Sequence, residues 1–177
     1  MRRKILLAFM SLLLVSGTLG ITACEKKNTN KEQTQSTSAE KKDHRPVQEV
    51  LSSLAEQYDT IASMDQSFYG DEKWKKYFEH LYEASPDLVL DYGIYYSNEA
   101  KADEVNLLYA KSQEDVSLLK SKLEARIQSR IKTFESYLPE EVAKFDTAVI
   151  GSYDQYVYLI ISDQSKEIED SLLKTLK

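Results

Sequence analysis

The feature that most constrains the fold is a polar segment at residues 25–45, which separates an apolar leader from the rest of the chain. Ala39 is its only apolar residue. A segment of this composition cannot bury enough apolar surface to offset the entropy cost of folding. We therefore expect a disordered tether at residues 24–45 and a single folded domain at residues 46–177, whose 132 residues are close to the commonest domain size.

Residues 1–23 have the layout of an export signal. A basic start, Met1-Arg2-Arg3-Lys4, precedes an apolar run that ends near Leu19 and is shorter than the roughly 20 residues of a membrane span. The tetrad Ile21-Thr22-Ala23-Cys24 resembles a bacterial lipobox, which implies cleavage between Ala23 and Cys24 and acylation of Cys24. The alternative is an ordinary secretory signal followed by a chance cysteine. The lipobox reading places the protein on the outer face of the bacterial cytoplasmic membrane, held by the lipid.

Composition and charge exclude several classes of site. One cysteine allows no internal disulfide and no thiolate zinc cluster, and two histidines leave little for a metal centre, so we expect no metal and no cofactor. The tether has a net charge of +2 and residues 46–177 have a net charge of −11. A domain this acidic lacks the basic surface that nucleic acid requires, so nucleic acid is not an expected partner.

Residue periodicity predicts an α+β fold. Apolar residues at helical spacing predict helices from Pro46 to Ile61, from near Asp71 to before Pro86, from the Ser112–Asp115 capping box to Leu138, briefly after Pro139, and at the C-terminus. Alternating patterns predict strands at Leu88–Ser97, Val105–Lys111, Thr147–Ser152 and Tyr156–Ser162. We expect an antiparallel four-stranded sheet made of two β-hairpins, with helices before, between and after them.

Several motifs in the second half of the chain resemble one bacterial lipoprotein family. They are Ala102-Asp103-Glu104-Val105, Arg126 to Phe134, Tyr137-Leu138-Pro139-Glu140-Glu141, and Ala148-Val149-Ile150. Together they resemble the domain of unknown function DUF4358, with the family-like part at residues 86–177. Where that family often has Gly-x-Tyr before the last strand, this chain has Asp154-Gln155-Tyr156. The resemblance implies a fold and a lipoprotein location, and it implies no activity, catalytic residue or cofactor.

Arginine is rare in the folded part, where Arg126 and Arg130 are the only two. Their spacing places both on one border of the apolar stripe of the long helix, with Tyr137 on the same border. One hypothesis is that the pair binds a carboxylate or phosphate of a ligand or partner. The alternative is that the stems cover the edge of the core and the guanidinium groups pair with acids of the domain.

Tyrosine is frequent, with 12 residues against five Phe and one Trp. In the last predicted strand Tyr156 and Tyr158 share one face, to which Tyr95 is a possible addition. One hypothesis is an open aromatic face that stacks on a sugar or binds a partner segment. The alternative is that helices cover both faces of the sheet.

Few residues are suited to catalysis. His44 lies in the tether and His80 on a helix, and the Asp103-Glu104 pair lies beside a strand, where adjacent side chains face opposite ways. No known nucleophile, phosphate-loop or metalloprotease motif occurs. We expect a non-catalytic binding or accessory module whose partner is an envelope protein or a cell-wall component. The alternatives are a cell-wall hydrolase that uses carboxylates and a small-ligand carrier.

Overall fold

A computed structural model describes residues 44–97 and 100–177 of the chain. Ordered along the sequence, its helices and strands are α1 (Val47–Ala55), α2 (Asp59–Ala62), β1 (Asp65–Phe68), α3 (Trp74–Tyr82), β2 (Val89–Tyr96), β3 (Glu104–Ala110), α4 (Asp115–Tyr137), α5 (Ala143–Asp146), β4 (Val149–Tyr153), β5 (Tyr156–Ile161) and α6 (Ser165–Leu176). Two short 3-10 turns, Pro86–Leu88 and Pro139–Glu141, follow α3 and α4. The predicted α+β class is confirmed.

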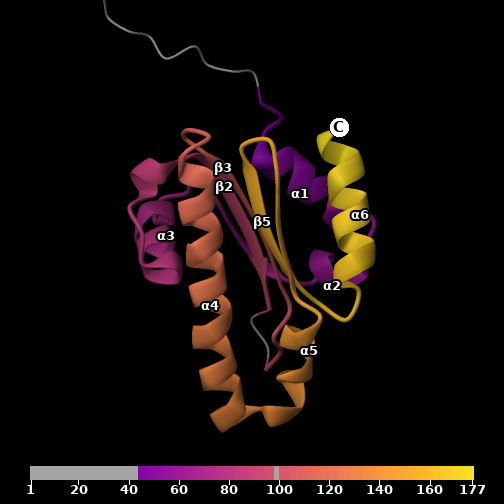
Figure 1. Cartoon of the computed structure of the whole chain (residues 1–177). Helices are drawn as coiled ribbons and strands as arrows, with labels where there is room; N and C mark the ends of the chain where they lie inside the picture. Colours follow the sequence, from indigo (N-terminus) through magenta and orange to yellow (C-terminus); the bar gives the residue numbers. More distant parts are fainter. Residues whose placement is uncertain (1–43, 98–99) are drawn as a thin grey trace, which may run out of the picture. The chain divides into compact units, whose positions relative to one another are not determined.

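The sheet has five antiparallel strands in the order β1-β2-β3-β5-β4 (Figure 1). The two predicted hairpins, β2–β3 and β4–β5, are present, and they meet where β3 pairs with β5. The prediction of four strands is wrong, because β1 adds a fifth at the edge of β2. This strand is four residues long and begins Asp65-Gln66-Ser67, so it has no apolar alternation by which a strand is recognised.

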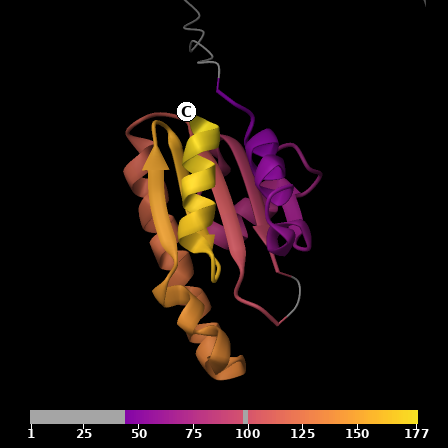
Figure 2. The same ribbon diagram turned by 90° about the vertical axis from the view of Figure 1, so that its right-hand side faces the viewer.

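Helices cover both faces of the sheet, α3 and α4 on one and α1 and α6 on the other (Figures 1 and 2). Each face has its own apolar core. On the first, Phe78 and Leu119 pack with Tyr92 and Leu159. On the second, Leu51 and Leu172 belong to a separate cluster with residues of β3 and β5. The domain is therefore a three-layer arrangement with β3, whose residues are all buried, at its centre.

Two helix boundaries differ from the prediction because side chains bond elsewhere. The first predicted helix ends at Ala55, since Tyr58 adopts an extended backbone and its hydroxyl donates to the Glu167 carbonyl of α6 at 2.9 Å. Helix α3 begins at Trp74 rather than near Asp71, since the Asp71 carboxylate accepts the main-chain N–H of Phe68 at 2.7 Å. Asp71 thus closes one end of the β1 edge instead of capping a helix.

The described part of the chain begins at His44, two residues before the predicted domain boundary. The imidazole stacks on Tyr109 with ring centroids 4.0 Å apart, and its Nε2 lies 3.2 Å from the Asp91 carboxylate. The same carboxylate accepts the N–H of Val47 at 2.8 Å, which satisfies a free donor at the start of α1. The Arg45 guanidinium donates to the Thr175 carbonyl near the C-terminus. His44 and Arg45 therefore belong to the domain and not to the tether.

The predictions for the leader concern residues outside the described part. The signal at 1–23, the cleavage position at Ala23 and Cys24, and the tether up to residue 43 all lie there. Within residues 44–97 and 100–177, no helix has the length and apolar character needed to cross a membrane.

Candidate functional site

A buried carboxylate, Glu104, lies at the start of the central strand β3, and its side chain is 0% exposed. Pairing with β2 and β5 fixes its position in the sheet. A buried carboxylate without a compensating cation costs several kcal/mol, so its surroundings decide what it can do.

Both arginines of α4 converge on Glu104. The Nε and Nη2 atoms of Arg126 each donate to a different Glu104 oxygen at 2.6 Å, a bidentate pair. The Nη1 atom of Arg130 lies 3.3 Å from Glu104 Oε2, and its Nη2 donates to the Ala102 carbonyl at 3.1 Å. The two arginines lie on one side of α4 as predicted, and the carboxylate that they hold belongs to the domain itself. This arrangement agrees with the alternative in which the guanidinium groups pair with acids of the domain.

A buried hydrogen-bond chain extends the network along β3 to helix α3. The Asn106 amide donates to Glu104 Oε1 at 2.7 Å, and the Tyr82 hydroxyl of α3 donates to Asn106 Oδ1 at 2.5 Å. Asn106 and Tyr82 were not predicted as part of any site. A signal for one of them exists in the sequence, since Glu104 and Asn106 are polar residues two apart in an otherwise apolar strand and so share a face.

The network keeps its charges at neutral pH. Burial acts to raise the pKa of Glu104, but the charges and hydrogen bonds of Arg126, the charge of Arg130 and the Asn106 amide outweigh it and hold that pKa below its ordinary value. Burial lowers the pKa of Arg130, whereas the Glu104 carboxylate outweighs burial at Arg126 and raises its pKa. A carboxylate held ionised by two guanidinium groups is a poor general acid, and it has no free lone pair aimed at a substrate.

A second ionic group holds the neighbouring Asp103. Lys144 Nζ lies 2.6 Å from Asp103 and 3.1 Å from Glu141, and Glu141 also accepts the Ala102 N–H at 2.8 Å. Asp103 and Glu104 therefore have different partners, in agreement with the expectation that adjacent side chains face opposite ways. Both side chains are buried.

A pocket of about 400 Å³ lies between the C-terminal end of α3 and the middle of α4. Arg126 and Arg130 form part of its wall, together with His80, Lys122 and the acidic Glu83. Lys122 is already bonded to the Glu83 carbonyl at 2.8 Å. At this pocket the two arginines border a space that a small molecule can enter.

The hypothesis of an open tyrosine face is wrong. Tyr156 and Tyr158 are buried on the α1 and α6 side of the sheet, opposite to the side that carries Arg126. The Tyr158 hydroxyl donates to Glu169 of α6 at 2.7 Å, and the Tyr156 hydroxyl donates to the Arg45 carbonyl at 2.7 Å. Burial raises the pKa of Tyr156 to about 12. These tyrosines are core residues whose hydroxyls anchor flanking segments.

Tyr137 joins neither group. It is 74% exposed in the last turn of α4, about 10 Å along the helix from Arg130. The predicted ligand-binding set is therefore divided into a buried arginine pair, a buried tyrosine pair on the opposite face and an isolated surface tyrosine.

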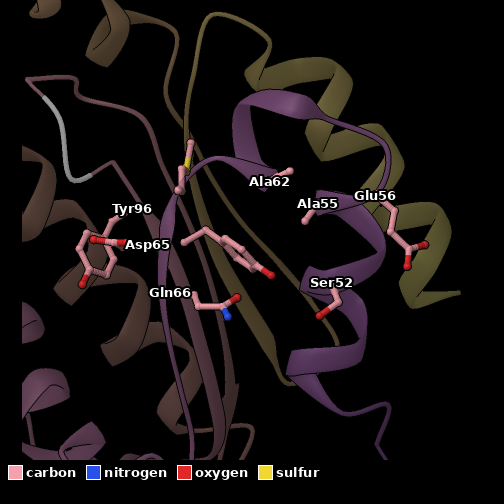
Figure 3. A pocket seen from close by; sticks show the side chains of 9 residues that line it. Ser52, Ala55, Glu56, Ala62, Asp65, Gln66 and Tyr96 are labelled. Carbon is pink, nitrogen blue, oxygen red and sulfur yellow. The ribbon is translucent and has the colours of Figure 1, made fainter.

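A larger, open hollow of about 720 Å³ lies between β1 and α1 at the edge of the sheet (Figure 3). Figure 3 shows Ser52 and Ala55 of α1 facing Gln66 of β1 across this hollow, while Asp65 and Tyr96 lie together on the other side of β1. We call this hollow the edge groove; it is lined by Ser52, Ala55, Glu56, Ala62, Met64, Asp65, Gln66, Tyr95 and Tyr96. The edge groove could not be predicted from the sequence, because strand β1, which forms one of its walls, lacks the apolar alternation by which a strand is recognised.

The described residues offer no obvious metal site. In residues 44–97 and 100–177 no group of three or more His, Cys, Asp or Glu side chains is arranged to hold an ion. The His44 ring is engaged by Asp91 and Tyr109, and His80 borders the pocket between α3 and α4.

Comparison with known proteins gives one match. A family model described as a domain of unknown function, DUF4358, matches residues 62–162. The matched region begins in α2, ends just after β5 and so includes all five strands. It starts upstream of the family-like part expected at 86–177 and stops before α6. No curated protein and no solved structure matches the chain.

Proposed function

The chain belongs to the DUF4358 family, and we propose that it is a membrane-anchored extracytoplasmic lipoprotein whose folded domain is a non-catalytic binding or accessory module of the cell envelope. Its partner in this proposal is another envelope protein or a cell-wall component. The anchor is the lipid on Cys24, and residues 24–43 connect the anchor to the domain.

The observation that carries the non-catalytic part is the internal pairing of the buried charged groups. Glu104 is bound by Arg126 and Arg130, and Asp103 is bound by Lys144. A carboxylate pair that hydrolyses a glycosidic bond needs one member protonated and both facing a substrate. The two adjacent acids instead have separate cationic partners, which speaks against the hydrolase alternative.

The location rests on the leader. A basic start, a short apolar run and a cysteine after Ile-Thr-Ala favour lipid attachment over a spanning helix. Acyl chains each contribute about 0.8 kcal/mol per buried methylene, so two or more chains hold a protein firmly at a membrane. A basic tether next to anionic lipid and an acidic domain repelled by it also agree with a domain held off the surface.

A small-ligand carrier is the second candidate, and the pocket between α3 and α4 favours it. Arg126 and Arg130 border its space of about 400 Å³, which suits a small anionic ligand. The acidic Glu79 and Glu83 in the same wall weaken the attraction for an anion.

Replacement of the cysteine tests the anchor. Cys24→Ser is expected to release the chain from membranes or to leave it unprocessed, since a serine at that position gives no thioether-linked lipid. The measurement is membrane fractionation together with the mass of the mature N-terminus. A Cys24→Ser chain that still sediments quantitatively with membranes at the mature mass contradicts the lipid anchor.

A turnover assay tests the non-catalytic part. The purified whole chain is incubated with cell-wall fragments and the products are separated by mass. We expect no products above those of a heat-denatured control. Product formation above that control establishes the hydrolase alternative instead.

A further inference from the structure

Strand β1 is an edge strand with an open side. It pairs with β2 alone, in a register that sets Asp65 opposite Tyr96 and Gln66 opposite Tyr95. The Tyr69 N–H donates to the Tyr92 carbonyl, which continues that register and shows that the odd-numbered residues bond to β2. The N–H and C=O of Gln66 and Phe68 therefore point away from the sheet.

In the described part of the chain, the outward main-chain groups of Phe68 have hydrogen-bond partners and those of Gln66 do not. Asp71 binds Phe68 at both main-chain groups, its carboxylate accepting the N–H at 2.7 Å and its own N–H donating to the carbonyl at 3.1 Å. No such group covers the outer side of Gln66 in the described part of the chain. An uncovered edge of this kind is a template for another strand.

The edge groove lies beside this open position. Small side chains at Ser52, Ala55 and Ala62 leave space between α1, α2 and the strand, and Tyr95 and Met64 supply apolar surface. Side chains of a strand added to β1 alternate between the two faces of the sheet. Those directed to the α1 side would enter the edge groove and meet largely small and apolar side chains.

The other side of β1 is acidic. Figure 3 shows Asp65 beside Tyr96 on the side of β1 away from α1, where both form the outer margin of the edge groove. Asp65 raises the pKa of Tyr96, second to the effect of burial, so its charge acts directly on that surface. Glu56 adds a second carboxylate at the groove. Neither acid has a salt-bridge partner within residues 44–97 and 100–177, and the domain has a net charge of −11.

We propose that the β1 edge binds an extended segment of another polypeptide in which apolar and basic residues alternate. The segment pairs with Gln66 by main-chain hydrogen bonds, places apolar side chains in the edge groove and places Lys or Arg against Asp65. This inference rests on the proposed role as a binding module and gives that module its partner class and its surface.

The test is a titration of the whole chain, purified in a neutral detergent, with a synthetic peptide that alternates Lys and Val over seven residues. Fluorescence anisotropy of the labelled peptide reports binding, and amide hydrogen exchange at Gln66 reports strand pairing. We expect saturable binding and slower exchange of the Gln66 amide. The same peptide with a central proline, or with Glu in place of Lys, is expected to bind at least about fivefold more weakly, because each loses a main-chain hydrogen bond or the charge match.

Two proline variants distinguish peptide binding at the β1 edge of the sheet from binding at the β4 edge. Gln66→Pro removes the outward N–H of β1 without breaking a bond to β2, and it is expected to weaken binding about fivefold to tenfold. The matched control is Ser152→Pro on β4, whose N–H also points outward at the opposite edge, and binding to it should change less than twofold. Equal weakening by both variants overturns the proposal, as does binding that Gln66→Pro leaves unchanged.

A charge reversal keeps the test decisive if Gln66→Pro does not fold. Asp65→Lys is expected to weaken binding of the Lys peptide and to strengthen binding of the Glu peptide. Salt should reduce both effects. Absence of saturable binding of the Lys peptide at millimolar concentration overturns the inference. That result leaves the anchored binding module standing, since Cys24→Ser release and the turnover assay test that function separately.

Discussion

Removal of the charge on Glu104 is predicted to be among the most damaging conservative changes in the domain. Glu104→Gln keeps the size of the side chain and leaves Arg126 and Arg130 partly buried without their carboxylate. Breaking a buried pair by neutralising one member typically costs about 3–5 kcal/mol. For a domain of this length that corresponds to a fall in Tm of roughly 10–20 °C.

The assay is urea unfolding followed by circular dichroism, with Glu124→Gln as the matched control. Glu124 is exposed on the same helix as the two arginines, and its replacement should change the unfolding free energy by less than about 0.5 kcal/mol. A double variant, Glu104→Gln with Arg126→Met, should cost less than the sum of the single changes by about 1–3 kcal/mol. If Glu104→Gln costs no more than Glu124→Gln, the network does not hold the domain together and the reasoning is refuted.

The difference in unfolding free energy between the natural chain and Glu104→Gln should change with pH in a defined direction. Because the folded pKa of Glu104 lies below its unfolded value of about 4.3, its contribution is fully present above that value and is lost as the pH falls through the folded pKa. The stability gap between the natural chain and Glu104→Gln should be constant from about pH 6 to 8 and should narrow below about pH 4. A gap that widens on acidification contradicts a depressed pKa.

Two further changes test the backbone and the packing of the domain. Glu83, at the C-terminal end of α3, has a left-handed φ of 48°, so Glu83→Gly should stabilise the domain by about 0.5–1 kcal/mol, and a lower urea midpoint would contradict this. At Gly93 an added Cβ would lie 2.8 Å from side-chain atoms of Val47, Leu51 and Phe68, so Gly93→Ala should cost about 1–3 kcal/mol in the same assay; an unchanged midpoint would show that α1 shifts freely on the sheet.

The two hairpins could be predicted because their information is local. Tyr156 to Ile161 is a continuous run of six aromatic and aliphatic residues, and it follows a turn in which Asp154 takes a left-handed φ of 52°. Strand β1 could not be predicted in this way. It forms because residues 65–68 lie along β2, a contact set by the path of the chain through α2.

In the candidate site, too, the local features could be predicted and the long-range contacts could not. Helical spacing was enough to place Arg126 and Arg130 on one border of α4, but their partner depends on which strand lies beneath that helix. Strand alternation correctly put Tyr156 and Tyr158 on one face. Whether that face is open depends on α1 and α6, which come from opposite ends of the folded domain and are brought together only by the fold.

The attachment of His44 and Val47 to Asp91 has a mechanical consequence. Asp91 belongs to β2, the strand that also pairs with β1 through residues 93–96. If the membrane pulls on the chain at His44 while a partner pulls on β1, the force runs along β2 between its two ends. Force along paired strands loads several ladder hydrogen bonds at once, whereas force across them opens the bonds one at a time. If the domain is anchored and binds a partner at β1 as proposed, this arrangement is expected to resist tension between the membrane and that partner.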